Sequence, residues 1–146
     1  MVFMARGKGR GLGLIAVVLV GLLLAFVGYV RLSPVDPAAW HQPVEQAEDA
    51  DLAGGAVRVI DGGEEQLQRI DAIPRELPRT EILAGSVAAG HITYITRSAV
   101  FGFPDMTTVE RRGDQIRMYA RLRFGASDLG VNRERLERVI ATLQGG

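Results

Sequence analysis

Apolar and polar residues alternate along residues 114–125, DQIRMYARLRFG. The apolar side chains share one parity: Ile116, Met118, Ala120, Leu122 and Phe124. The other parity is polar or charged: Gln115, Arg117, Tyr119, Arg121 and Arg123. A period of two is typical of a strand that is buried on one side, so one face packs in a core and the other meets water or a partner.

A turn and a helix follow this strand. Asp128 and Gly130 suit the turn, because an Asp side chain binds nearby backbone N–H groups and glycine tolerates positive φ. Asn132 suits a helix N-cap. Apolar residues then recur at helical spacing: Leu136, Val139, Ile140 and Leu143. We expect a helix that packs one apolar stripe on the sheet, and structural roles for Asp128, Gly130 and Asn132.

The pattern upstream predicts a first helix and three more strands. Asp61–Ile73 has Asp61 as a cap, Glu64 at the capping-box position and one apolar stripe, and Pro74 ends it. Strands are predicted over residues 81–88, 91–98 and 106–112, and 57–60 has the pattern of a short edge strand. The strand at 91–98 mixes parities, which indicates either burial on both faces or a bulge. The turn FGFPD, 101–105, should insert its aromatic rings into the core.

These elements predict an α+β fold in two layers: a helix, a four-stranded antiparallel meander and a second helix. The soluble domain is expected over residues 56–146, after a spacer or linker at 31–55. Within the spacer, Asp36 and Pro37 suit the start of a short helix, and 42–55 is acidic and poor in large apolar residues. The length leaves room for one such domain.

Residues 12–30, LGLIAVVLVGLLLAFVGYV, are continuously apolar. A helix of this length spans about 28 Å, close to a hydrocarbon core of about 30 Å, so we interpret it as a transmembrane helix. The alternative is a cleaved signal peptide, whose apolar run is usually shorter, about 7–15 residues. Arg6, Lys8 and Arg10 precede the run and Arg31 follows it. The positive-inside rule then predicts a cytoplasmic tail at 1–11 and a periplasmic domain anchored once in the inner membrane.

Composition narrows the chemistry. The chain has no Cys, which excludes disulfides, thiolate metal sites and a Cys nucleophile. Its net charge is zero, with 17 basic and 17 acidic residues, but the acids gather before residue 82 and most arginines after residue 96. We expect the two halves to pair in the fold. The mildly acidic soluble part does not support nucleic-acid binding.

The polar face of the strand at 115–124 is the main candidate site. Arg117, Arg121 and Arg123 with Tyr119 form a cationic ladder, and Arg97 can join it from a neighbouring strand. Arginine offers planar bidentate donors, so this face suits an anionic lipid headgroup or a carboxylate ligand, with Asp105 at its edge. The alternative is that these arginines are solvated or paired with the acidic first half.

The sequence assigns no catalytic residue, metal or cofactor. His41 and His91 are the only histidines and have no ligand-type spacing. Ser98, His91 and Asp105 supply the residue types of a hydrolytic triad, but no nucleophile-elbow motif accompanies them.

Three segments resemble the bacterial family catalogued as domain of unknown function 1499: RLRFGASDLGVNRERLERVIATL, YITRSAVFGFPD and RLSPVDPAAWH. The resemblance covers most of the chain from Thr80 to Leu143. It implies a membrane-associated or envelope protein and no established activity, substrate or catalytic residue. Many relatives carry a Cys near the start of the domain and paired acidic residues where this chain has Asp105 and Met106.

The function expected from the sequence is a non-catalytic binding or accessory module in the periplasm, with an unidentified ligand. Its expected partners are the bilayer through residues 12–30, an anionic lipid or small molecule, and a membrane protein. Two alternatives from other classes stay open. One is an envelope hydrolase that acts through Asp105, His91 or Asp128, and the other is a module that recruits proteins at the inner membrane.

Overall fold

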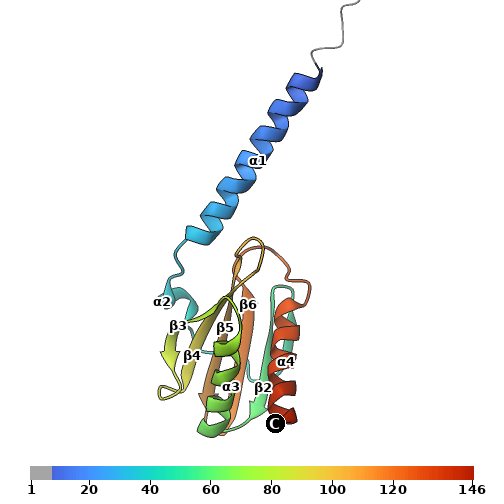
Figure 1. The fold of residues 1–146 in the computed structure, drawn as a ribbon. Coiled ribbons are helices and arrows are strands. Elements are labelled where there is room, and N and C mark those ends of the chain that lie inside the picture. Colours follow the sequence, from blue (N-terminus) through green and yellow to red (C-terminus); the bar gives the residue numbers. More distant parts are fainter. Residues whose placement is uncertain (1–7) are drawn as a thin grey trace, which may run out of the picture. The chain divides into compact units, whose positions relative to one another are not determined.

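The structure, a computed structural model, describes residues 8–146. The chain divides into two compact units, one ending at Ser33 and the other running from Pro34 to Gly146. Helix α1, Lys8–Leu32, lies in the first unit (Figure 1). Residues 1–7 of the predicted cytoplasmic tail lie outside the described part of the chain.

Helix α1 is 25 residues long, or about 37 Å at 1.5 Å per residue. Its large apolar side chains between Leu12 and Leu24 are each at least 50% exposed. The helix is therefore long and apolar enough to cross a membrane, as the sequence predicted.

The second unit contains a six-stranded antiparallel sheet in the order β1-β2-β6-β5-β4-β3 (Figure 1). Its strands are β1 Ala50–Leu52, β2 Gly55–Asp61, β3 Thr80–Ser86, β4 His91–Arg97, β5 Pro104–Arg112 and β6 Gln115–Leu122. The α+β class and the antiparallel meander from β3 to β6 are confirmed. The predicted number of four strands is wrong.

The two additional strands come from the N-terminal side of the domain. Strand β2 lies inside the sheet, with β1 on one side and β6 on the other, so the edge position expected for residues 57–60 is wrong. Gly55 allows the close approach to β6, since a Cβ there would lie 2.4 Å from the carbonyl oxygen of Ala120. Strand β1 has three residues, too few to show a period in the sequence.

Helices α3, Glu64–Glu76, and α4, Val131–Gly145, lie side by side on one face of the sheet (Figure 1). We call this the helix face, and the opposite side the open face. The core lies between the helices and the sheet, and its larger members are Leu67, Ile70, Ile92, Tyr94, Val109, Ile116, Met118, Leu136, Val139 and Leu143. The apolar parity of β6 and the stripe of α4 therefore pack as predicted.

Helix α3 has boundaries that differ from the prediction at both ends. Helix α3 begins after Gly63, because Asp61 is still paired in β2 with Gln115 and cannot act as the cap. It then continues through Pro74 to Glu76. Proline removes one backbone donor from the helix, but Pro74 is buried, so its ring contributes packing there.

The structure explains the mixed parity of apolar residues in β4. Ile92 and Tyr94 are buried on the helix face and Ile95 on the open face, so burial on both faces is confirmed, while a bulge lies in β3 between Ile82 and Ala84. The FGFPD prediction is wrong, because the core cluster contains neither aromatic residue of this turn. Residues 101–103 lie beyond the last β4–β5 pair, Arg97 with Pro104, and the tip of this hairpin projects past the ends of α3 and α4 (Figure 1).

Candidate functional site

The predicted cationic ladder lies on the open face, and a segment of the same chain covers it. We call residues 34–45 the strap. The strap contains α2, Pro37–Trp40, and Asp36 caps this helix by accepting from the N–H of Ala38 at 2.9 Å, as predicted. Val44, farther along the strap, is only 1% exposed. The predicted spacer is thus partly packed on the sheet.

Arginines of β6 hold the strap through its main chain. Arg117 donates to the carbonyl oxygen of Val44 at 3.2 Å, and Arg121 donates to that of Trp40 at 2.6 Å. Arg123, just past the strand, donates to the carbonyl oxygen of Pro34 at 3.0 Å. These arginines therefore bind the strap through its backbone carbonyl oxygens, which are polar groups that need a hydrogen-bond partner when they are covered.

Arg121 occupies the most enclosed position of the ladder. Its guanidinium carbon lies 4.6 Å from the ring centroid of Tyr119 and 5.3 Å from that of Trp40. It also donates to the hydroxyl of Thr108 at 3.3 Å. Burial lowers the pKa of Arg121, although it remains cationic. Arg97 projects from β4 on the same face and donates to the carbonyl oxygen of Gly102 at 3.4 Å.

The two histidines meet next to Trp40, within the strap. The rings of His41 and His91 stack with centroids 3.8 Å apart, and Nδ1 of His41 lies 2.9 Å from the hydroxyl of Thr93. Burial lowers the pKa of His41, the charge of His91 lowers it further, and Glu110 opposes both effects. Glu110 also accepts from the N–H of Val44 at 2.8 Å. The part of the strap from His41 to Val44 is therefore held by groups that include titratable side chains.

Asp105 lies on the helix face, in a polar cluster with the start of α4. Its carboxylate accepts from the side-chain amide of Asn132 at 3.3 Å and lies 3.5 Å from Nη1 of Arg135. Burial raises the pKa of Asp105, while Arg135 and Asn132 act in the opposite direction. Arg135 also donates to the side-chain oxygen of Asn132. The cluster thus fixes α4 to the end of β5.

The start of α4 differs in part from the prediction. The turn and cap roles are distributed among Asp128, Gly130 and Asn132 as follows. Asp128 accepts from the N–H of Gly130 and of Asn132, each at 3.0 Å, so its turn role is confirmed. Burial opposes ionisation there, but these hydrogen bonds lower the pKa of Asp128. Gly130 takes the N-cap position with φ of 83°. Asn132 is inside the helix and fully buried in the polar cluster, so its predicted N-cap role is wrong.

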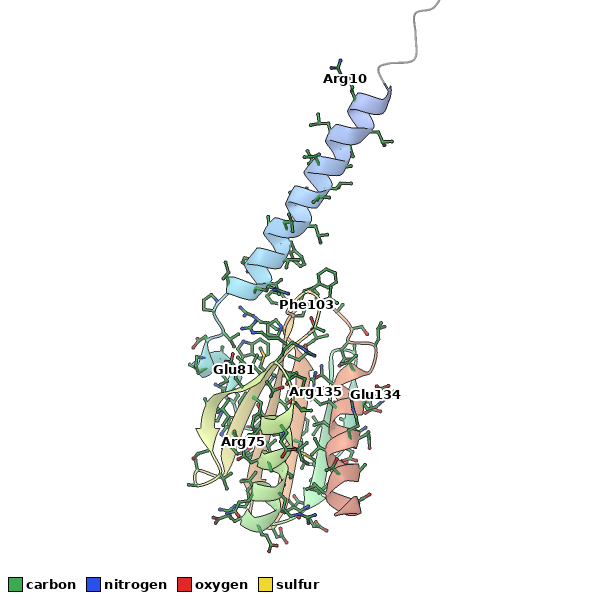
Figure 2. All side chains as sticks on the ribbon, in the orientation of Figure 1. Arg10, Arg75, Glu81, Phe103, Glu134 and Arg135 are labelled. Carbon is green, nitrogen blue, oxygen red and sulfur yellow. The ribbon has the colours of Figure 1, made fainter. Side chains whose placement is uncertain are left out.

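A cavity of about 420 Å³ opens beside this cluster, between the C-terminal end of α3, α4 and β4. We call it the arginine pocket. Figure 2 shows Arg135 near the end of α4 that is uppermost in the view, toward the sheet. The pocket is lined by Ile73, Leu77, Pro78, Arg79, Thr96, Arg135, Arg138, Val139 and Thr142. Its volume falls in the range of about 300–1,000 Å³ that is usual for small-molecule sites.

A second polar group lies farther along the helix face. The hydroxyl of Tyr94 donates to Asp71 at 2.5 Å, and Nε of Arg75 donates to the other carboxylate oxygen of Asp71 at 2.6 Å. Burial raises the pKa of Tyr94, and the bond to Asp71 adds to the effect. A cavity of about 310 Å³ adjoins Tyr94 and Arg75. These hydrogen bonds among the three side chains connect α3 to β4.

The structure does not assemble the trio of Ser98, His91 and Asp105. His91 lies on the open face against His41, whereas Asp105 is on the helix face and pairs in register with Thr96 at the far end of β4. Ser98 accepts from the N–H of Phe103 at 3.0 Å in the hairpin turn. Within residues 8–146, no group of three or more acidic, Cys or His side chains has the arrangement of a metal site. The hydrolase interpretation loses its structural support.

The family model for DUF1499, described as a protein of unknown function, matches residues 31–143. The chain belongs to this family. The match begins at Arg31, so the DUF1499 region includes the strap as well as the sheet and both of its helices. The comparison with curated proteins finds no match.

Sequence reasoning missed three residues of the arginine pocket in this DUF1499 domain: Arg79, Arg135 and Arg138. A partial signal existed, because Arg135, Arg138 and Thr142 follow the spacing of one helix face beside the apolar stripe. Arg79 gave no periodic signal, since it lies in the connection between α3 and β3 with a left-handed φ of 58°. Only the fold brings these residues together.

Proposed function

We propose that this chain is a single-pass membrane protein whose domain, residues 34–146, is a non-catalytic binding module outside the cytoplasm, with the arginine pocket as its ligand site. The observation that carries the membrane part is the exposed apolar surface of α1 between Leu12 and Leu24. Such a surface is costly in water and is stable in hydrocarbon.

The proposed orientation rests on charge. Arg6, Lys8 and Arg10 precede the apolar run, whereas Arg31 alone follows it closely. Basic residues are retained on the cytoplasmic side, which supports a cytoplasmic N-terminus and, in a two-membrane cell, a periplasmic domain.

The choice of the arginine pocket over the ladder rests on hydrogen-bond donors. Arg117, Arg121 and Arg123 donate to the strap, so a ligand would first have to displace residues of the same chain. Arg79 and Arg138 line the pocket instead and form no ion pair with any residue of the described chain. The pocket thus supports ligand binding without a rearrangement.

Topology is tested by fusing alkaline phosphatase or β-galactosidase to the C-terminus of the full chain. Our proposal predicts an active phosphatase, an inactive galactosidase and retention of the intact chain in the membrane fraction. Galactosidase activity would overturn the orientation. A soluble product shortened at its N-terminus would replace the anchor by a cleaved signal peptide.

Ligand binding is tested by native mass spectrometry of the full chain, released from nanodiscs prepared directly from membranes of its native host. We expect a reproducible additional mass that is lost when Thr142→Trp fills the pocket and kept with Thr142→Ser. An unmodified mass in all three proteins, with the topology intact, would overturn the pocket as the ligand site.

A further inference from the structure

The arginine pocket combines two kinds of surface. Ile73 at the end of α3, Leu77 just after it and Val139 from α4 provide an apolar side, and Arg79, Arg135 and Arg138 also line the pocket. Within the described chain, the residues that line the pocket include no carboxylate. A pocket that is apolar and also rimmed by cations selects ligands for both properties.

The arginines of the pocket differ in how they are engaged. Arg135 is 15% exposed at its side chain and is committed to Asp105 and Asn132. Arg138 is exposed, and Nε donates to the carbonyl oxygen of Glu134 at 3.3 Å. Burial lowers the pKa of Arg135, and the nearby charge of Arg138 is one of the further causes. The positive charges therefore lie close enough to reinforce one another's potential.

Arg79 is held in place before any ligand binds. Its backbone adopts a left-handed conformation, with φ of 58°, and Nε donates to the carbonyl oxygen of Arg97 at 3.1 Å. Non-glycine residues in this conformation are strained, and they cluster at binding sites where the surrounding structure enforces them. One nitrogen is used to orient the guanidinium, which leaves its two Nη groups for a ligand.

From these observations, and resting on the proposed function, we propose that the arginine pocket binds an anionic amphiphile. Its head is an oxyanion, a carboxylate or phosphate monoester, held by Arg79 and Arg138, and its apolar chain lies along Ile73, Leu77 and Val139. Arginine suits both heads, because its planar donors match two oxygens at once. A small inorganic anion would leave the apolar side chains of the pocket exposed to water. A neutral lipid would leave the guanidinium groups without a negative partner.

The test is photocrosslinking in nanodiscs of zwitterionic lipid that contain the full chain. The probes carry the same diazirine-labelled acyl chain on a carboxylate, on a glycerol phosphate monoester or on neutral glycerol, and crosslinked peptides are mapped by mass spectrometry. We expect both anionic probes to label residues 73–79 and 138–142, and the neutral probe to label them at least tenfold less. Equal labelling by the neutral probe would overturn the proposal.

Charge variants sharpen the test. Arg79→Gln and Arg138→Gln should each reduce labelling of the pocket by about tenfold, as expected for the loss of hydrogen bonds to a charged group. Arg111→Gln is the matched control, since it removes another exposed positive charge, which follows the His91–Glu110 pair at the end of β4–β5 away from Thr96. A similar loss with Arg111→Gln would overturn the assignment of the head to the pocket. Inorganic phosphate at the same concentration should not compete, and competition by phosphate would overturn the amphiphile.

Failure of this inference can be told apart from failure of the proposed function. A mass bound in the host membrane and lost with Thr142→Trp, combined with no labelling by the anionic probes, overturns the amphiphile and leaves the binding module in place. No bound mass and no labelling overturn both.

Discussion

Arginines of β6 on the open face donate to carbonyl oxygens of the strap, at 2.6 Å for Arg121 and 3.2 Å for Arg117. On the helix face, Arg79 and Arg138 line a cavity and have no carboxylate partner within the described residues. The sequence alone shows exposed-type arginines in both regions and does not distinguish them. They differ in what the fold places beside the guanidinium, and this decides whether the arginine holds the structure together or is available to a ligand.

The two faces also differ in how they are covered. Helices α3 and α4 bury a continuous apolar core on one side. The strap on the other side makes contacts through a few buried groups, such as Val44 and the stacked histidines. We therefore expect the helix face to carry the cooperative stability of the domain and the strap to open more readily.

The largest effect should come from the core of the helix face. Leu136→Ala removes a fully buried side chain of α4 and should lower the free energy of unfolding by about 2–5 kcal/mol. Urea unfolding of the full chain in nanodiscs, followed by far-UV circular dichroism, measures this. Val44→Ala in the strap is the comparison and should cost less. Equal costs would show that the strap is part of the same cooperative unit.

The next effect concerns the polar cluster at the start of α4. Asp105→Ala leaves Arg135 largely buried without its carboxylate and should cost about 1–3 kcal/mol. Glu45→Ala breaks a pair with Arg112 that is 3.7 Å long and exposed, and should have little effect. Thermal unfolding measures both variants. An Asp105→Ala variant with an unchanged free energy of unfolding would mean that solvent already screens the cluster.

A smaller effect should come from the turn before α4. Asp128→Ala removes the acceptor for two backbone N–H groups, and the loss should be about 1 kcal/mol. Because the pKa of Asp128 is lowered from its ordinary value of 3.8 in the fold, its stabilisation is present at neutral pH and is lost as the pH falls from 3.8 through the lowered pKa. The difference in unfolding free energy between wild type and Asp128→Ala should therefore shrink in acid, and a difference independent of pH would contradict this role.

The smallest effect is a pH response confined to the strap. The pKa of His41 is lowered from 6.5 when the strap is docked, so the detached strap binds more protons at acidic pH. Docking is fully favoured above 6.5 and weakens as the pH falls through the lowered pKa. Hydrogen exchange of residues 37–45, corrected for intrinsic rates, should accelerate between pH 7.5 and about 5.5, while α4 stays protected. His41→Gln should abolish the response, and acceleration that persists in this variant would assign it to another group.

Elements with a strong period could be predicted from the sequence. The alternation of β6, the stripe of α4 and the apolar run of α1 each follow from local pattern, and the structure confirms these elements. The expected pairing between the halves of the chain is also present, for example Arg133 with Asp51 at 3.7 Å. Local pattern works here because each of these elements presents one uniform face to its surroundings.

The remaining features depended on tertiary contacts. Strand β1 is short and forms by pairing with β2. Asn132 is not the N-cap, because its side chain is buried in hydrogen bonds with Asp105 and Arg135. The strap could not be recognised, since it is held by carbonyl oxygens that every residue possesses. The arginine pocket joins residues from three elements, and only one of those elements carried a recognisable spacing.

The edges of the sheet have a consequence for neighbouring copies. One edge strand, β1, is three residues long, and the other, β3, is interrupted by a bulge between Ile82 and Ala84. Chains anchored in a bilayer, as proposed, would meet repeatedly at high two-dimensional concentration. Short or bulged edges offer a poor template for strand addition, so crowded domains would remain separate instead of joining into continuous sheets.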